Sequence, residues 1–201
     1  MGMGAVTQPG LLERDAGADS APRSRLRYLG LVLRRFLVPG FVVSLYGMLR
    51  WRVVISPRAE VELSGNLRFG PGNTVSSFSK IKATDGVLQT GRGCGFGTGC
   101  FVDTGTGGIV MGNNVLCGPN VVLVATNYNY DRVSVPLEEQ GVHSVGIRIG
   151  NNCWIGANSV VLDGSEIGDN SIVAAGSIVN RRFPPNSIIQ GNPAKLLLRR
   201  H

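Results

Sequence analysis

The sequence has few of the residues on which metal centres and disulfide frameworks depend. It contains two histidines, His143 and His201, and four cysteines, none of which has the C-x-x-C spacing of a zinc site. We therefore expect no metal. Aromatic residues make up only 6% and charged residues 16% of the 201 positions, whereas 43% are hydrophobic, which excludes a disordered chain and favours one main folded domain.

Long apolar runs are also missing. Residues 36–49 are uncharged, but these 14 positions fall short of the roughly 20 that a membrane-spanning helix needs, and Pro39-Gly40 interrupts them. A signal peptide fits poorly because a long polar stretch precedes the basic region and no small-residue cleavage site follows the apolar run. We expect a cytoplasmic protein.

Acidic residues are absent from residues 20–58, which carry eight arginines and account for the net charge of +7. Apolar residues at helical spacing lie among these arginines, as in a helix on the surface of an anionic membrane. The same pattern suits a helix that covers the end of a domain, and the sequence leaves both readings open. On the first reading, residues 23–52 contact the inner face of a membrane peripherally. We expect no nucleic-acid partner, because the basic residues flank an apolar helix and the chain lacks the usual aromatic-interleaved binding surface. The apolar positions are Leu26, Leu29, Leu33, Phe36 and Leu37.

Glycine is abundant, with 29 residues, and it punctuates a period of six. Aliphatic residues recur at every sixth position from Ile149 to Val179, and a small residue follows each of the first five by four positions. Three hexapeptides make one three-sided coil, so the period predicts a solenoid whose stacked coils bury an aliphatic column. Earlier blocks keep the same period at Met111, Cys117 and Leu123, at Thr90, Phe96 and Val102, and at Phe69, Val75 and Ile81.

The segments Ile149–Asn158 and Gly191–Lys195 resemble the hexapeptide-repeat acyltransferases, most closely the branch that O-acetylates sugars and polysaccharide precursors, such as the maltose and galactoside acetyltransferases. The resemblance covers about residues 69–195. It implies a mainly β protein with a left-handed parallel β-helix, a homotrimer, and acetyl-CoA or another acyl-CoA bound in the groove between neighbouring β-helices. A saccharide or another hydroxyl-bearing small molecule would be the acceptor.

Four regions follow from these patterns. We predict a leader over residues 1–22 without regular structure, a basic amphipathic helical segment over 23–58, the β-helix over 59–184 and a C-terminal cap over 185–201. Within the β-helix, 26 residues separate Leu123 from Ile149, so a loop over 124–148 must leave the coil. Insertions in a solenoid often form its binding face.

The resemblance implies that this loop carries a histidine that deprotonates the acceptor hydroxyl, in a motif that reads Asn-His-Asn-Tyr/Phe-Asp. Here residues 127–131 read Asn-Tyr-Asn-Tyr-Asp, so Tyr128 stands in the position of the histidine. A tyrosine has an ordinary pKa of about 10 and is a weak general base but a good hydrogen-bond donor. Asn127, Asn129 and Asp131 are candidates for binding the substrate.

Three alternatives accommodate Tyr128. His143 could supply the base, with Glu139 or Asp131 fixing its tautomer, although a lone histidine in a polar loop is as often a plain surface residue. The acceptor could instead be nucleophilic already, as an amine is. The protein could also be a relative without catalysis, in which Tyr128 binds a ligand or the trimer serves as a scaffold.

The remaining candidate residues follow from the resemblance. Asp103 would face sugar hydroxyls, although a turn aspartate also bonds its own backbone. Basic residues near the end of the repeat suit the phosphates of the donor, and small residues on successive coils would let its pantetheine arm pass. Solvated turns and corner packing are the alternatives for these positions. The candidates for binding the donor are Trp154, Ala157, Ala175, Asn180, Arg181, Arg182 and Lys195.

Overall fold

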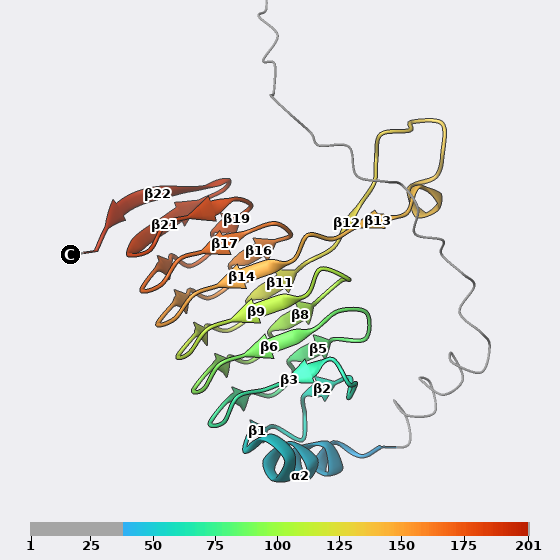
Figure 1. Cartoon of the computed structure of the whole chain (residues 1–201), viewed down its shortest axis with the longest axis vertical. Helices are drawn as coiled ribbons and strands as arrows, with labels where there is room; N and C mark the ends of the chain where they lie inside the picture. The colour runs from blue at the N-terminus through green and yellow to red at the C-terminus, as the bar shows by residue number, and fades with distance from the viewer. Residues whose placement is uncertain (1–37, 201) are drawn as a thin grey trace, which may run out of the picture.

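Successive short strands of the chain are distributed in turn over three parallel sheets, which form the three sides of a stack of coils (Figure 1). The computed structural model describes residues 38–200. Sheet A contains β1 (Val54–Ile55), β4 (Thr74–Val75), β7 (Gly95–Phe96), β10 (Leu116–Cys117), β15 (Trp154–Ile155), β18 (Ile172–Val173), β21 (Ser187–Gly191) and β22 (Ala194–Arg199).

The other two sides have six strands each. Sheet B contains β2 (Glu60–Val61), β5 (Lys80–Lys82), β8 (Phe101–Asp103), β11 (Val122–Val124), β16 (Val160–Leu162) and β19 (Ile178–Val179). Sheet C contains β3 (Leu67–Arg68), β6 (Leu88–Thr90), β9 (Ile109–Met111), β14 (Ile147–Ile149), β17 (Glu166–Ile167) and β20 (Arg182–Phe183). The predicted mainly β, left-handed parallel β-helix is confirmed.

The hexapeptide period produces the core. All six aliphatic positions from Ile149 to Val179 are at most 3% exposed, and the earlier sites from Phe69 to Leu123 are buried as well. The small residues that follow them are buried too, and their side chains bond across the coils. The Ser165 hydroxyl donates to the Val179 carbonyl at 3.0 Å, and the Cys100 thiol donates to the Gly118 carbonyl at 3.3 Å. Serine and cysteine at this position therefore make the same interaction, a hydrogen bond to a backbone carbonyl of the next coil.

Asparagine ladders hold the corners between sheets C and A. Asn114, Asn152, Asn170 and Asn186 all have φ between 54° and 62°, the left-handed region that asparagine tolerates. Each side-chain amide donates to the oxygen of the next, at 3.1 to 3.2 Å. At the corner between sheets A and B the equivalent left-handed positions hold Gly99, Asn120, Asn158 and Gly176, but Phe78 has φ of 62° there and is 67% exposed.

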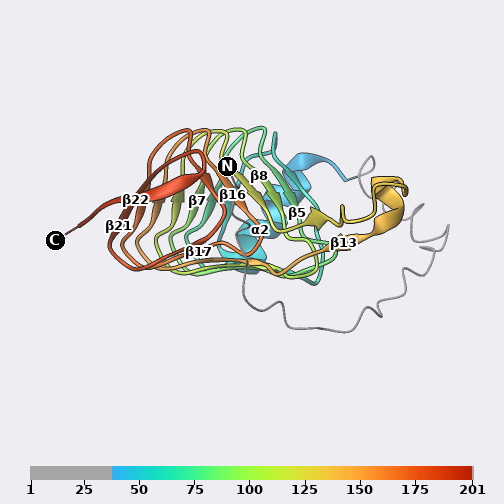
Figure 2. The same ribbon diagram turned by 90° about the horizontal axis from the view of Figure 1, so that it is seen from above.

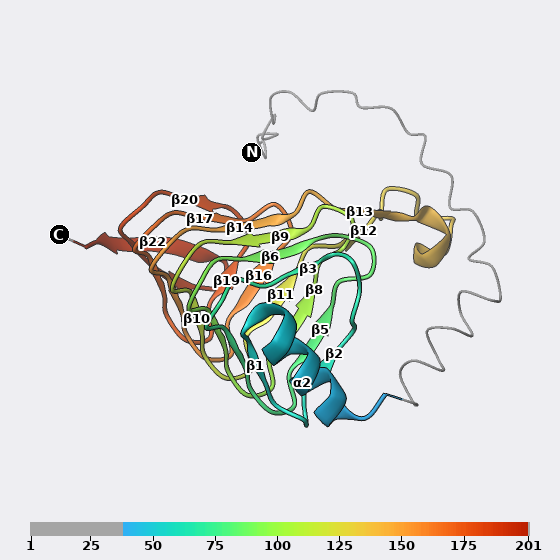
Figure 3. The ribbon, with the colours of Figure 1, turned by 60° about the horizontal axis from the view of Figure 1, so that its bottom comes forward.

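The two ends of the stack are covered. Helix α2 (Gly40–Trp51) lies across the first coil, with Val43 and Gly47 buried against it (Figure 3). At the other end β22 folds back antiparallel onto β21. In the part of the chain from 38 to 200, no helix has the length and apolar character needed to pass through a membrane.

Two predicted boundaries need correction. The β-helix begins at β1, before residue 59, because Val54 and Ile55 already pair with Thr74 and Val75. It also continues past residue 184, because β21 pairs in parallel with β18, so only β22 departs from the coil pattern. The predicted leader 1–22 and the first part of the 23–58 segment lie outside the described residues.

Candidate functional site

A long excursion leaves the stack at the edge between sheets B and C (Figure 2). It departs after β11 and returns at β14, within the predicted range of 124–148. Its two arms form an antiparallel ribbon of β12 (Asn127–Tyr128) and β13 (Val142–His143), and a short 3-10 helix, η1 (Leu137–Gln140), lies between them. A returning ribbon of this kind holds its side chains in a fixed register.

The register of the ribbon sorts the candidate residues onto two faces. Asn127 pairs with His143, and Tyr128 pairs with Val142. Paired residues share a face and neighbours along a strand alternate, so Asn127, Asn129 and His143 lie on one face, and Tyr128 lies on the other. Tyr128 is 55% exposed. The structure therefore brings His143 together with the two asparagines and separates it from Tyr128.

His143 has a defined partner. Its Nδ1 lies 3.0 Å from Oδ1 of Asn129, and Nδ2 of the same asparagine donates to the Gln140 carbonyl at 3.1 Å. The expected orienting groups, Glu139 and Asp131, are exposed, and neither forms a side-chain bond to a residue within 38–200. The geometry therefore assigns the contact with the ring to Asn129, which the sequence had suggested only as a substrate-binding residue.

Gln140 shapes the excursion from inside and was not singled out from the sequence. Its buried amide accepts from the Arg132 N–H at 3.0 Å and donates to the carbonyls of Arg132 at 2.9 Å and Val135 at 2.8 Å. These bonds close the excursion on itself. A glutamine directly before Gly141, whose φ is 77°, was the available signal in the sequence.

Asp163 anchors the base of the ribbon and was also missed. One of its oxygens accepts from the N–H groups of Val145 and Gly146, at 2.9 and 2.7 Å, and the other accepts from Nδ2 of Asn127 at 3.3 Å. The ribbon face that carries Asn127 and His143 is therefore held toward the coil that bears Asp163. An aspartate followed by Gly164 reads as an ordinary turn in sequence, which hides this role.

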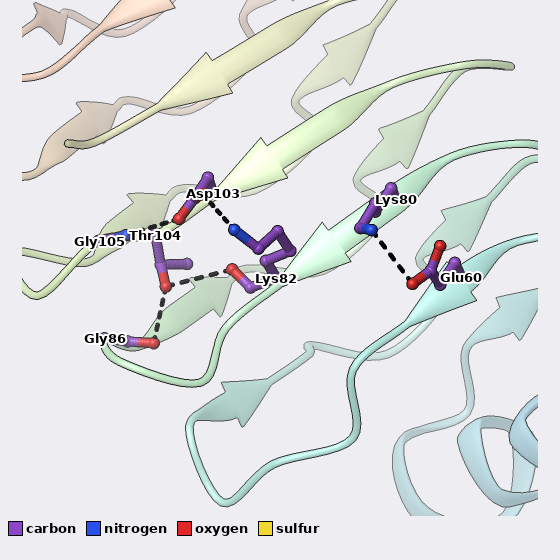
Figure 4. A network of polar contacts seen from close by, with 7 residues as sticks. All are labelled: Glu60, Lys80, Lys82, Gly86, Asp103, Thr104 and Gly105. Carbon is purple, nitrogen blue, oxygen red and sulfur yellow. Dashed lines mark hydrogen bonds and ion pairs between the residues drawn. The ribbon is translucent and has the colours of Figure 1, made fainter. Parts of the chain in front are cut away.

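Asp103 lies one strand below the departure point, because it pairs in register with Val124. Its Oδ2 accepts from Lys82 Nζ at 2.8 Å, and its Oδ1 accepts from the Gly105 N–H at 3.2 Å (Figure 4). The hydrogen bond with Asp103 raises the pKa of Lys82, against a smaller opposing effect of burial. A lysine paired with a carboxylate one strand from the departure of the ribbon offers both donors and acceptors to a polar ligand.

The candidate donor-binding residues fall on separate edges of one chain. Trp154 stands 54% exposed on sheet A, and Ala157 and Ala175 turn the corner from sheet A to sheet B. Asn180, Arg181 and Arg182 are exposed at the corner from sheet B to sheet C, where Arg182 Nε lies 3.4 Å from Glu166 Oε2. Lys195 is exposed on β22. No single groove of one chain unites these residues in the part that the structure describes.

The cysteines lack the features of reactive or metal-binding thiols. Cys94, Cys100, Cys117 and Cys153 are free and buried. Burial raises the pKa of all four thiols, and most strongly that of Cys117. A thiol that stays protonated is a poor nucleophile and a poor ligand. Between residues 38 and 200, no group of three or more histidine, cysteine or acidic side chains could hold a metal ion.

Comparison with known protein families identifies the repeats in part of the chain. Residues 146–181 match the model of the bacterial transferase hexapeptide family (six repeats), and the predicted resemblance to hexapeptide-repeat transferases is thereby confirmed. The period, the three-sided coils and this match define the class of protein as a hexapeptide-repeat β-helix.

Two galactoside O-acetyltransferases match part of the chain. The galactoside O-acetyltransferase of Escherichia coli (strain K12) is 42% identical over 90 residues, which cover 44% of this chain and 43% of the relative. The galactoside O-acetyltransferase of Lactococcus lactis subsp. lactis (strain IL1403) is 34% identical over 109 residues, which cover 51% of each protein. The chain thus matches about half the length of these curated relatives.

Solved structures share the fold. An N-acyltransferase from Bacillus cereus, in complex with dTDP and 3-hydroxybutyryl-CoA, superposes with a TM-score of 0.67 at 19% identity, covering 75% of this chain and 81% of that one. A variant of perosamine N-acetyltransferase from Caulobacter crescentus, in complex with CoA and GDP-perosamine, has a TM-score of 0.55 at 26% identity, covering 72% of this chain and 55% of that one.

Proposed function

We propose that the protein is a CoA-dependent acetyltransferase that acts on a saccharide or another small hydroxyl-bearing acceptor. The observation that carries the proposal is the ribbon at the edge between sheets B and C, which presents His143, Asn127 and Asn129 on one face. The Lys82–Asp103 pair lies one strand from the point where the ribbon departs. An imidazole can take the proton of a hydroxyl, and the amides and the carboxylate can orient it. The similarity to galactoside O-acetyltransferases supports this class of acceptor.

His143 is the base in this proposal. A hydroxyl is a poor nucleophile at neutral pH, and histidine is the side chain suited to deprotonating it. Tyr128 lies on the other face of the ribbon, where its hydroxyl would donate a hydrogen bond to a ligand bound on that side. Asp131, exposed on the same excursion, would contact the acceptor, and Glu139, also exposed, stays a candidate for a catalytic role.

A homotrimer would complete the donor site. Trp154, Ala157 and Ala175 lie toward one edge of the chain and Arg181 and Arg182 toward another, so a groove between two neighbouring β-helices could unite them. Sheet B supports such an association because its outward side is apolar over several coils and only partly covered within one chain. The aligned residues are Phe101, Val122, Val160 and Ile178.

Calorimetric titration with acetyl-CoA tests the donor site without knowledge of the acceptor. We expect saturable binding that weakens in the double variant Arg181→Ala, Arg182→Ala, because both arginines would contact the phosphates. The double variant Arg68→Ala, Arg92→Ala removes the same charge from exposed arginines elsewhere and should bind as the wild type does. Absence of binding by the folded protein would refute the proposal and favour a scaffold without catalysis.

An amine acceptor is the second candidate. Tyr128 in the expected histidine position favours it, because a neutral amine needs less help from a base than a hydroxyl does. The similarity to perosamine N-acetyltransferase points the same way. Acetyl transfer to an amino sugar, measured beside a galactoside that lacks an amine, separates the two. Activity on the amino sugar that survives His143→Ala would favour this candidate.

The proposal also includes peripheral membrane contact through residues 23–52. The structure describes residues 38–52 of this segment. The outer face of α2 is apolar, with Phe41, Leu45 and Leu49 from 54% to 77% exposed, and Arg50 follows at its end. Such a face suits the surface of an anionic membrane. Replacing Phe41, Leu45 and Leu49 by serine should reduce flotation with phosphatidylserine vesicles.

The matched control replaces Leu196, Leu197 and Leu198 of β22, which are also exposed, by serine. Equal flotation of both variants and the wild type would contradict the membrane contact.

A further inference from the structure

The contact between Asn129 and His143 fixes more than the position of the ring. An asparagine amide can present either its oxygen or its NH₂ group to a neighbour, and the two choices demand opposite protonation of the histidine nitrogen. The second contact of Asn129 decides between them. Nδ2 lies 3.1 Å from the Gln140 carbonyl oxygen, which can only accept, so the NH₂ group must face Gln140 and Oδ1 must face His143.

An oxygen 3.0 Å from Nδ1 requires a proton on Nδ1. The neutral ring therefore carries its hydrogen on Nδ1 and has its lone pair on Nε2. Nε2 forms no hydrogen bond with residues 38–200, and the side chain is exposed. We propose that Asn129 is a positioning residue that holds His143 in the Nδ1–H tautomer, so that Nε2 is free to accept a proton from the acceptor.

The surrounding ribbon makes this arrangement firm. Asn129 continues the β12 pairing through its own N–H, which donates to the Gly141 carbonyl at 3.0 Å. Gln140 presents its carbonyl to Asn129 while its buried amide is held by Arg132 and Val135. The acceptor that orients Asn129 is thus anchored inside the excursion. Gln140 thus fixes the orientation of Asn129, and Asn129 fixes the orientation of the His143 ring, as base-orienting partners do in other sites.

The tautomer can be read directly by nuclear magnetic resonance. Histidine labelled with ¹⁵N gives different nitrogen shifts and proton couplings for the Nδ1–H and Nε2–H forms. The full chain has one other histidine, so His201→Gln assigns the signals of His143 and leaves the sequence of the ribbon unchanged. Spectra should be taken at a pH where the ring is neutral. We expect the Nδ1–H pattern in the wild type.

Two variants of Asn129 test the role of its oxygen. In Asn129→Ala nothing holds the Nδ1 proton, and the ring should move to the Nε2–H form that free histidine favours in water. Asn129→Asp still offers an oxygen and should keep the Nδ1–H form. An Nε2–H ring in the wild type, or an unchanged ring in Asn129→Ala, would overturn the proposal.

The kinetic consequence rests on the proposed acetyl transfer, whereas the spectroscopic result does not. Asn129→Ala should lower kcat about tenfold, less than the roughly 100-fold expected for loss of the imidazole in His143→Ala, and Asn129→Asp should restore most of the rate. If no acetyl transfer is found, the proposed function fails while the tautomer remains measurable. A kcat unchanged in Asn129→Ala beside a large loss in His143→Ala would reject the positioning role.

Discussion

Substitution of Asn152 separates two contributions to stability in the asparagine ladder between sheets C and A: the amide hydrogen bonds and the tolerance of a left-handed backbone. Asn152 accepts from Asn114 at 3.1 Å and donates to Asn170 at 3.2 Å, and its φ is 54°. Each exposed amide bond contributes about 0.5–1 kcal/mol, and a left-handed backbone costs alanine about 1 kcal/mol. We therefore expect Asn152→Ala to lower the free energy of unfolding by about 2–3 kcal/mol.

Glycine at the same position accepts the left-handed backbone but makes no amide bonds. Asn152→Gly should be about 1 kcal/mol less destabilising than Asn152→Ala. Asn186 ends the ladder and makes one such bond, so Asn186→Gly should lose about half as much as Asn152→Gly.

Thermal unfolding followed by circular dichroism, at a fixed concentration of protomers, measures these differences, with about 2–4 °C for each kcal/mol. If the glycine and alanine variants of Asn152 melted together, the left-handed backbone would not be the source of the difference. If both melted with the wild type, the ladder would contribute no stability.

Three further predictions concern other parts of the molecule. Phe78→Asn should raise the melting temperature, by the equivalent of about 1 kcal/mol, because asparagine relieves the left-handed strain at an exposed site; a lower melting temperature would show that the Phe78 ring contributes packing. The hydrogen bond to Asp103 raises the pKa of Lys82 above its ordinary 10.5, so it stabilises the fold fully below pH 10.5 and the gain is lost as the pH rises through the raised value. In urea unfolding, Asp103→Asn should therefore have a lower free energy of unfolding than the wild type at pH 8, and this difference should shrink as the pH rises above 10.5 and through the raised value. A difference independent of pH would refute this sign. Tyr128→His should raise acetyl transfer to a hydroxyl acceptor severalfold by adding a second imidazole to the ribbon, provided that the donor still binds; no gain with a verified acceptor would count against Tyr128 as the replaced base.

The β-helix was predictable from sequence because its cause is local and repeated. An aliphatic residue every six positions, such as Ile155 and Val161, must turn inward at every coil, and the break between Leu123 and Ile149 had to become a loop. The first coil keeps the same period at Ile55, Val61 and Leu67, but it is offset by two residues from the block that begins at Phe69. This offset hid the first coil, so the pairing of β1 was missed.

The chemistry of the excursion could not be predicted in the same way. The partner of His143 depends on the register of β12 against β13, which no period in the sequence specifies. Glu139 and Asp131 are the orienting groups expected from the sequence, but both side chains are exposed, Glu139 on the 3-10 turn of η1. Asn129 reaches the ring because it lies diagonally across the ribbon from His143.

The stacking of equivalent corners has a consequence for how such a chain can change in length. Asn152 and Asn170 are 18 residues apart and occupy the same place on successive coils. A tandem duplication of that segment would add a coil whose inner residues meet copies of their own neighbours, and an in-frame loss would rejoin Asn152 to Ser171, which stands where Cys153 stood. Growth by a whole coil therefore leaves both covered ends and the projecting ribbon intact, whereas this loss would also remove Asp163 from the base of the ribbon. Duplication can thus alter the height of the protein without rebuilding its interior.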